Sequence, residues 1–119
     1  MSMQINQRRV GEITVLELSP AHTGDFSNEL FRPQIESVLA EGARRILFDL
    51  SRMSWINSTQ LGLLIFAHRL MDEQKGKTAL VGANERVRDL MKVVGVLSSW
   101  HLYESEEAAL DFLQQDQKA

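Results

Sequence analysis

Four consecutive polar residues, Asn57-Ser58-Thr59-Gln60, carry the side chains best placed to do chemistry in this sequence. They lie between a short polar turn and an apolar run that begins at Leu61, which predicts that they open a helix. The start of a helix presents unpaired backbone N–H groups and the positive end of the helix dipole. A serine there, such as Ser58, can cap the helix, bind an anion or carry a phosphate.

The same residue types also predict a structural role for this cluster. Asn57 can accept a hydrogen bond from the first turn of the helix, and Gln60, three residues on, can reach back, much as in a capping box. Capping and phosphorylation of Ser58 are compatible, and both stay open at this point. Thr59 is the alternative phosphoacceptor, but its side chain points about 100° away from that of Ser58 around the helix axis.

No pattern for catalysis or metal binding accompanies these residues. The histidines His22, His68 and His101 fall in three different predicted elements, without the paired spacing of a metal site. A hydrolase triad of Ser58, a histidine and Asp49 would lack the Gly-x-Ser-x-Gly elbow and an evident oxyanion hole. A Walker loop and a dinucleotide fingerprint are also missing. We therefore predict that the protein is not an enzyme and uses no cofactor or metal, with His68 as a core residue.

Length and composition predict one domain over residues 1–119. A chain of 119 residues can bury one core, and its 44% hydrophobic and 24% charged residues are typical of globular proteins. A net charge of −3 argues against nucleic acid as the main partner. No segment reaches the ~18 apolar residues of a membrane span, and the first ten residues are too polar for a secretory signal. With no cysteine present, the prediction is a cytoplasmic protein without membrane insertion.

Strands and helices are predicted to alternate after an opening hairpin of strands at 3–9 and 13–18. A loop follows at 19–25, Ser27 is a candidate cap, and Pro33 moves the regular part of the first helix to near residue 32. The later elements are expected at 46–50, 78–82 and 99–103 for strands, and at 32–42, from 57 to near 76, 84–95 and 105–113 for helices. The tail at 114–119 is expected to be frayed.

This order predicts an α/β single domain with helices covering a mixed, mostly parallel sheet of about five strands. The third helix is expected to bury a stripe that includes Val94. Gly62 is expected to let the second helix approach the sheet closely. Met53 and Trp55 allow two interpretations, as exposed anchors for a partner or as the edge of the core under the loop, and Trp100 is similarly ambiguous.

The run Asp49-Leu50-Ser51, followed by Ile56-Asn57-Ser58-Thr59-Gln60-Leu61-Gly62, resembles the STAS domains and, more closely, the bacterial anti-sigma-factor antagonists. Their motif reads Asp/Asn-Leu, a short turn, an apolar residue and then Asp-Ser-Ser/Thr-Gly-Leu-Gly. The run at 87–95 resembles the third helix of the family, so the resemblance covers nearly the whole chain. The sequence differs from the family at Asn57, which replaces an aspartate, at Gln60, which replaces a glycine, and at Thr23, in a loop that usually supplies another acid.

The resemblance implies a STAS-like fold and a regulatory interaction module that is an anti-sigma-factor antagonist. The first serine of the family motif, here Ser58, is the one that a partner kinase phosphorylates. Phosphorylation at Ser58, or alternatively Thr59, is therefore expected to switch binding of an anti-sigma factor or kinase-like regulator. A monomer or weak dimer is expected. The surface that binds the partner is expected to consist of Trp55, Asn57, Ser58, Thr59 and Gln60.

The family's acidic residues are absent at Asn57 and in the loop at Thr23, and this leaves a second hypothesis open. A divergent STAS protein that is never phosphorylated could be a permanent subunit of a transporter or signalling assembly. Asn57 keeps hydrogen bonding without charge, which removes a carboxylate that could orient the serine or interact with a metal held by a kinase.

Overall fold

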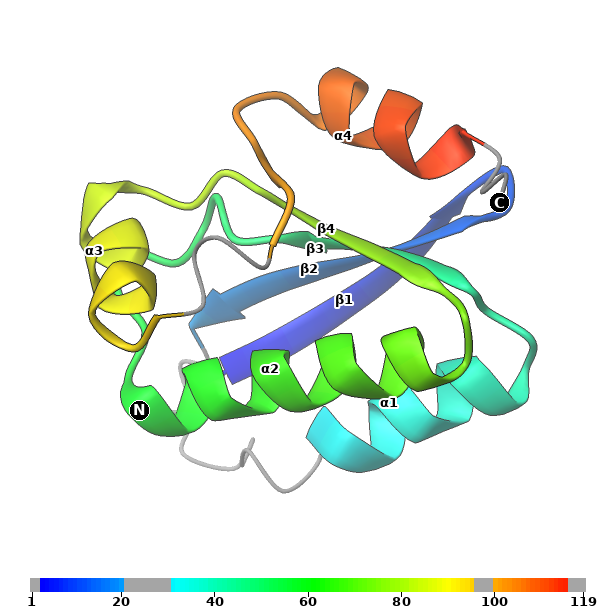
Figure 1. The fold of residues 1–119 in the computed structure, drawn as a ribbon, viewed down its shortest axis with the longest axis horizontal. Helices are drawn as coiled ribbons and strands as arrows, with labels where there is room; N and C mark the ends of the chain where they lie inside the picture. The colour runs from blue at the N-terminus through cyan, green and yellow to red at the C-terminus, as the bar shows by residue number, and fades with distance from the viewer. Residues whose placement is uncertain (1–2, 21–30, 96–99, 116–119) are drawn as a thin grey trace.

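A computed structural model describes residues 3–20, 31–95 and 100–115 and places them in one sheet flanked by helices (Figure 1). The sheet has the order β1-β2-β3-β4-β5, with β1 antiparallel to β2 and the other neighbours parallel. The predicted α/β fold, with its opening hairpin, is confirmed. The elements are β1 (Met3–Val10), β2 (Ile13–Pro20), α1 (Phe31–Ala40), β3 (Arg45–Asp49), α2 (Ser58–Glu73), β4 (Lys77–Val81), α3 (Glu85–Val93), β5 (Leu102–Tyr103) and α4 (Glu106–Gln114).

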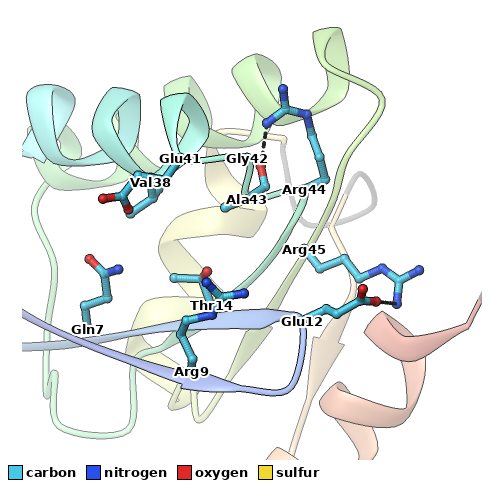
Figure 2. A pocket seen from close by; sticks show the side chains of 10 residues that line it. All are labelled: Gln7, Arg9, Glu12, Thr14, Val38, Glu41, Gly42, Ala43, Arg44 and Arg45. Carbon is cyan, nitrogen blue, oxygen red and sulfur yellow. Dashed lines mark hydrogen bonds and ion pairs between the residues drawn. The ribbon is translucent and has the colours of Figure 1, made fainter.

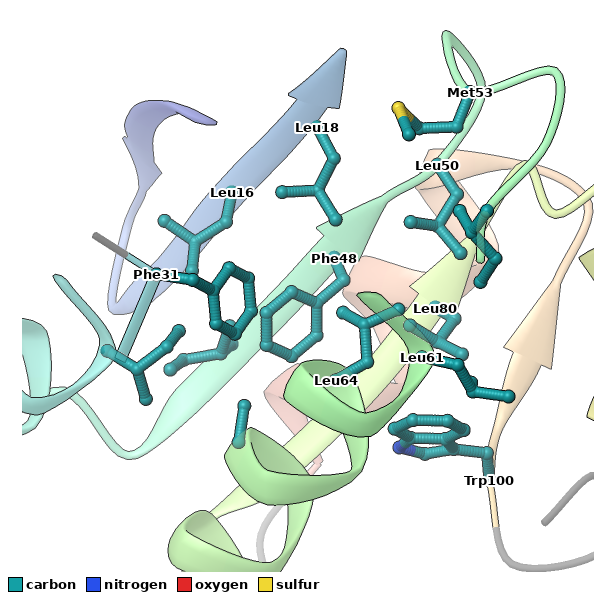
Figure 3. Packing of buried hydrophobic residues seen from close by; sticks show 14 of the residues in the cluster. Leu16, Leu18, Phe31, Phe48, Leu50, Met53, Leu61, Leu64, Leu80 and Trp100 are labelled. Carbon is teal, nitrogen blue, oxygen red and sulfur yellow. The ribbon is translucent and has the colours of Figure 1, made fainter. Parts of the chain in front are cut away.

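The sheet is covered on both faces, which explains the nearly unbroken apolar run of β3. One face packs against α1 and α2, where Phe48 stacks on Phe31 with ring centroids 6.4 Å apart (Figure 3). The other face packs against α4, through Leu47 of β3 and Leu113 of α4. α3 lies at the end of the sheet where β3 and β4 finish (Figure 1). The core is therefore divided by the sheet into two apolar layers.

Several element boundaries differ from the predicted ones. β2 continues to Pro20, and β5 contains only Leu102 and Tyr103. α1 begins at Phe31, so Pro33 lies in its first turn, where its missing N–H removes no helical hydrogen bond. Gln114 ends α4, although it was predicted as part of the frayed tail. The predicted cap Ser27 and the positions 21–25, 96–99 and 116–119 lie outside the described residues.

Two glycines near α2 have different structural roles. The prediction for Gly62 is wrong, because it is exposed and a Cβ added there would meet nothing within 4 Å. Gly82, after β4, has φ +78°, and an added Cβ would lie 2.6 Å from Ser51 Cβ and 2.8 Å from Ser51 Cα. The close approach therefore occurs between the loops that follow β3 and β4.

Gly82→Ala is expected to destabilise the protein by about 1 to 3 kcal/mol, since alanine would strain the backbone and push Ser51 away. Urea unfolding followed by circular dichroism measures the change. Gly62→Ala is the matched control and should stabilise the fold by up to about 1 kcal/mol, because the site is an open helix position. Equal stability of Gly82→Ala and the parent would show that the two loops do not depend on this contact.

His68 connects α2 to β4 and to Trp100, which precedes β5, as expected of a core-facing histidine. Its Nδ1 lies 2.6 Å from Thr78 Oγ1 of β4, and its ring meets Trp100 edge to face with centroids 5.3 Å apart. Trp100 is buried and belongs to the larger apolar cluster. Burial lowers the pKa of His68, the charge of Asp72 opposes this, and His101 and Arg69 lower the pKa further.

The lowered pKa makes stability depend on pH. Between the folded pKa of His68 and its usual value of 6.5, the unfolded chain binds more protons than the folded one. The contribution of His68 is therefore fully present above pH 6.5 and is lost as the pH falls through that window. Urea unfolding at a series of pH values should show this loss, and His68→Gln should make the slope shallower. An unchanged slope in His68→Gln would contradict the assignment.

Candidate functional site

The start of α2 is closed by a complete capping box, which confirms the predicted pairing. Asn57 is the N-cap, with φ −95° and ψ 174°, and its Oδ1 accepts a hydrogen bond of 2.7 Å from the Gln60 backbone N–H. The Asn57 N–H donates in turn to Gln60 Oε1 at 3.0 Å. Gln60 is 0% exposed. The buried Gln60 side chain therefore fixes the backbone of the N-cap residue. Both side chains of the capping box are neutral amides.

Ser58 and Thr59 are the first two residues of α2, and both are exposed. Because Asn57 provides the cap, the hydroxyl of Ser58 is not needed to satisfy the backbone of the first turn. The first turn contains no acidic residue. No carboxylate of α2 therefore offsets the positive end of its helix dipole. This favours the binding or attachment of a negatively charged group at the start of α2.

The loop between β3 and α2 is fixed at both of its ends. Asp49 Oδ1 accepts hydrogen bonds from the backbone N–H of Ser51 at 2.9 Å and from its Oγ at 2.6 Å. The Leu50 N–H donates to the Val81 carbonyl of β4 at 2.8 Å. Met53 and Ile56 are buried. These contacts hold the loop against the core and leave the residues between them to form its surface.

Asn84 connects this loop to the next one. Its Nδ2 donates to the Ser54 carbonyl at 3.0 Å, while its Oδ1 accepts from the Val87 N–H at 2.9 Å and caps α3. The sequence predicts the cap, but nothing local in it indicates the bond to Ser54, thirty positions away. Together with the contact between Gly82 and Ser51, this bond sets the position of the loop that precedes Ser58.

The structure decides between the two interpretations of Met53 and Trp55, as exposed anchors or as core residues. Trp55 is 41% exposed, so it is available to a partner, whereas Met53 belongs to the core. Trp100 is also a core residue. Val94 was predicted in the buried stripe of α3, which is wrong: its side chain is 46% exposed, and that of Val93 is 83% exposed. The helix stops at Val93, so Val94 follows its last turn instead of continuing the stripe.

Of the five residues predicted to bind a partner, four reach the surface of the protein and the fifth is buried. Trp55, Ser58 and Thr59 are exposed and Asn57 is half-buried. The Gln60 side chain is buried and therefore does not contact a partner directly. Within 3–20, 31–95 and 100–115 no three His, Asp or Glu side chains gather as a metal site, and His22 lies outside those ranges. No helix formed by these residues is long and apolar enough to cross a membrane.

The capping box is expected to contribute measurably to stability. Asn57→Ala should cost about 1 kcal/mol, because the first turn loses its side-chain acceptor. Gln60→Leu keeps most of the buried volume but leaves the Asn57 N–H without its partner, and the double variant should show a coupling of at least about 0.5 kcal/mol. Urea unfolding of the four proteins measures this cycle. Strictly additive losses would contradict a cooperative cap.

The exposed serine thus lies at a capped helix start that follows the third strand of a mixed five-stranded sheet. The model of the STAS domain family matches residues 4–109, and the chain therefore belongs to the STAS domain family. It is 30% identical over 80 residues to BtrV of Bordetella bronchiseptica, provisionally named an anti-sigma factor antagonist. That match covers 64% of this chain and 69% of BtrV.

A second relative and a solved structure are also similar to this chain. The anti-sigma-B factor antagonist of Staphylococcus aureus is 27% identical over 79 residues, which cover 63% of this chain and 73% of that relative. The structure of SpoIIAA from Bacillus, solved in its phosphorylated form, superimposes with a TM-score of 0.73 at 23% identity. The match covers 93% of this chain and 100% of the SpoIIAA chain, and it shows that the two share a fold.

Proposed function

We propose that this protein is an anti-sigma-factor antagonist, an interaction module without enzymatic activity that binds an anti-sigma factor or related serine kinase around Ser58. The observation that carries the proposal is the division of roles at the start of α2. Asn57 and Gln60 cap the helix, and Ser58 presents an exposed hydroxyl beside them. The names of two relatives support this function.

Phosphorylation of Ser58 is the proposed switch. A phosphoserine adds about −1.5 to −2 charges and three acceptor oxygens. The start of α2 tolerates that charge, because its dipole end is positive and its first turn contains no acid. A partner docked over Ser58 would meet the added charge directly. Binding is therefore lost at the interface while the fold is kept, and each ~1.4 kcal/mol of lost affinity is a factor of ten.

The proposed partner surface continues from Ser58 along the outer side of α2. A hollow of about 250 Å³ lies there, lined by residues that include Gly62, Ile65 and Phe66. Gly62 supplies no side chain, so the hollow stays open one turn after Ser58. The Arg32 guanidinium of α1 lies over the Phe66 ring, with its Cζ 4.3 Å from the ring centroid. It places a positive charge at the edge of this hollow. The exposed Trp55, three residues before Ser58, is also part of the proposed surface.

The switch is tested by incubating the protein with its cognate anti-sigma kinase and ATP and locating the added phosphate by peptide mass spectrometry. The parent and Thr59→Ala should be modified at Ser58, and Ser58→Ala should not be modified. Ser58→Asp should lower affinity for the kinase at least about a hundredfold, or nearly 3 kcal/mol. Ser58→Ala should bind like the parent. A parent protein that binds the kinase but is never phosphorylated would refute the switch.

A permanent, unphosphorylated STAS subunit is the second candidate. Two observations favour it: Asn57 is neutral, and the Asp49 carboxylate at the end of β3 already accepts two hydrogen bonds from Ser51. It predicts that Ser58→Asp binds the partner as well as Ser58→Ala does. A cytoplasmic location and a monomer or weak dimer remain predictions under both hypotheses, and sedimentation analysis of the purified protein measures the second.

A further inference from the structure

A polar cavity of about 240 Å³ lies at the end of the sheet opposite Ser58. It is open to solvent and lies between the β1–β2 hairpin and the connection from α1 to β3 (Figure 2). Arg45, the first residue of β3, lines it, whereas the Ser58 loop follows the last residue of that strand. The cavity is therefore separate from the proposed partner surface.

The floor of the cavity consists of three side chains that can donate hydrogen bonds. Thr14 and Arg9 are direct neighbours across the β1–β2 register, and Gln7 lies two residues before Arg9, on the same face of β1. Figure 2 shows Arg9 and Gln7 rising from the hairpin beside Thr14. The inner face of β2 is apolar at Leu18 and Leu16 and becomes polar at Thr14, under the end of α1.

Thr14 is 3% exposed, yet its hydroxyl has no hydrogen-bond partner among the described residues. The hydroxyl opens onto the cavity, where water or a ligand can accept its hydrogen bond. The exposed side chains of Arg9 and Gln7 likewise make no hydrogen bond or ion pair with the described residues. Three adjacent donors thus face the same cavity without an acceptor.

The other two arginines of the cavity have partners within the structure. Arg45 pairs with Glu12 at 3.7 Å, and the Arg44 guanidinium donates to the carbonyls of Leu39 and Ala43 at the end of α1. Glu41 lies exposed at the rim. With three arginines and two glutamates, the lining has one excess positive charge. Arg9 is left to interact with an anion from solution.

We propose that this cavity binds a small organic carboxylate, held by the Arg9 guanidinium, the Thr14 hydroxyl and the Gln7 amide. The planar fork of an arginine matches the two oxygens of a carboxylate, and a single excess charge suits a monoanion. The cavity of about 240 Å³ has room for a short-chain acid beside these three side chains. The site goes beyond the proposed function, since it shares no residue with the surface around Ser58.

The proposal is tested by titrating the isotope-labelled protein with propionate at constant ionic strength and following the backbone amides of residues 14 and 42–43 by NMR. Saturable shifts confined to the cavity are expected for the parent. Arg9→Gln and Thr14→Val should each weaken binding about tenfold or more. The exposed Arg86→Gln, on α3, is the matched control and should bind like the parent.

Thr14→Val also separates binding from folding. Valine keeps the β-branched shape but removes the unpartnered hydroxyl, so the urea midpoint should stay equal or rise while propionate binding falls. Inorganic phosphate serves as the competing probe. Absence of saturable propionate shifts, saturation by phosphate alone, or equal propionate affinity in the parent and Arg9→Gln would each overturn the proposal.

Discussion

The contact between the backbone of Ser51 and Gly82 is the constraint on which the site depends. These residues follow neighbouring parallel strands, and their separation leaves no room for a side chain at Gly82. The bond from Leu50 to Val81 and that from Asn84 to Ser54 lie on either side of this contact. The sheet thereby determines where the loop turns, and the turn determines where α2 begins and which side of Ser58 faces outward.

The parts of the site that could be predicted from the sequence are those that depend on neighbours in the chain. Asn57 and Gln60 are three residues apart, so their pairing follows from helix geometry alone. The apolar run of β3 likewise indicated a strand covered on both faces. Local pattern also located α1, because Pro33 restricts where a helix containing it can start.

The remaining features depend on residues that are distant in sequence. Gly62 and Gly82 are alike in the sequence, and only the packing of two loops shows that the second one is constrained. The burial of Gln60 and the exposure of Val94 depend on where each helix lies over the sheet. The meeting of Arg9 with Thr14 requires the hairpin register, since neither residue type indicates a site by itself.

The neutral cap has a consequence for how the start of α2 responds to its surroundings. Neither amide titrates, so acidification leaves the Asn57–Gln60 pair intact and salt has no ion pair to screen there. A phosphate on Ser58 would be the first ionic group in this turn of the helix. Its second ionisation, with a pKa near 6, would then make the charge at this surface sensitive to small changes in pH.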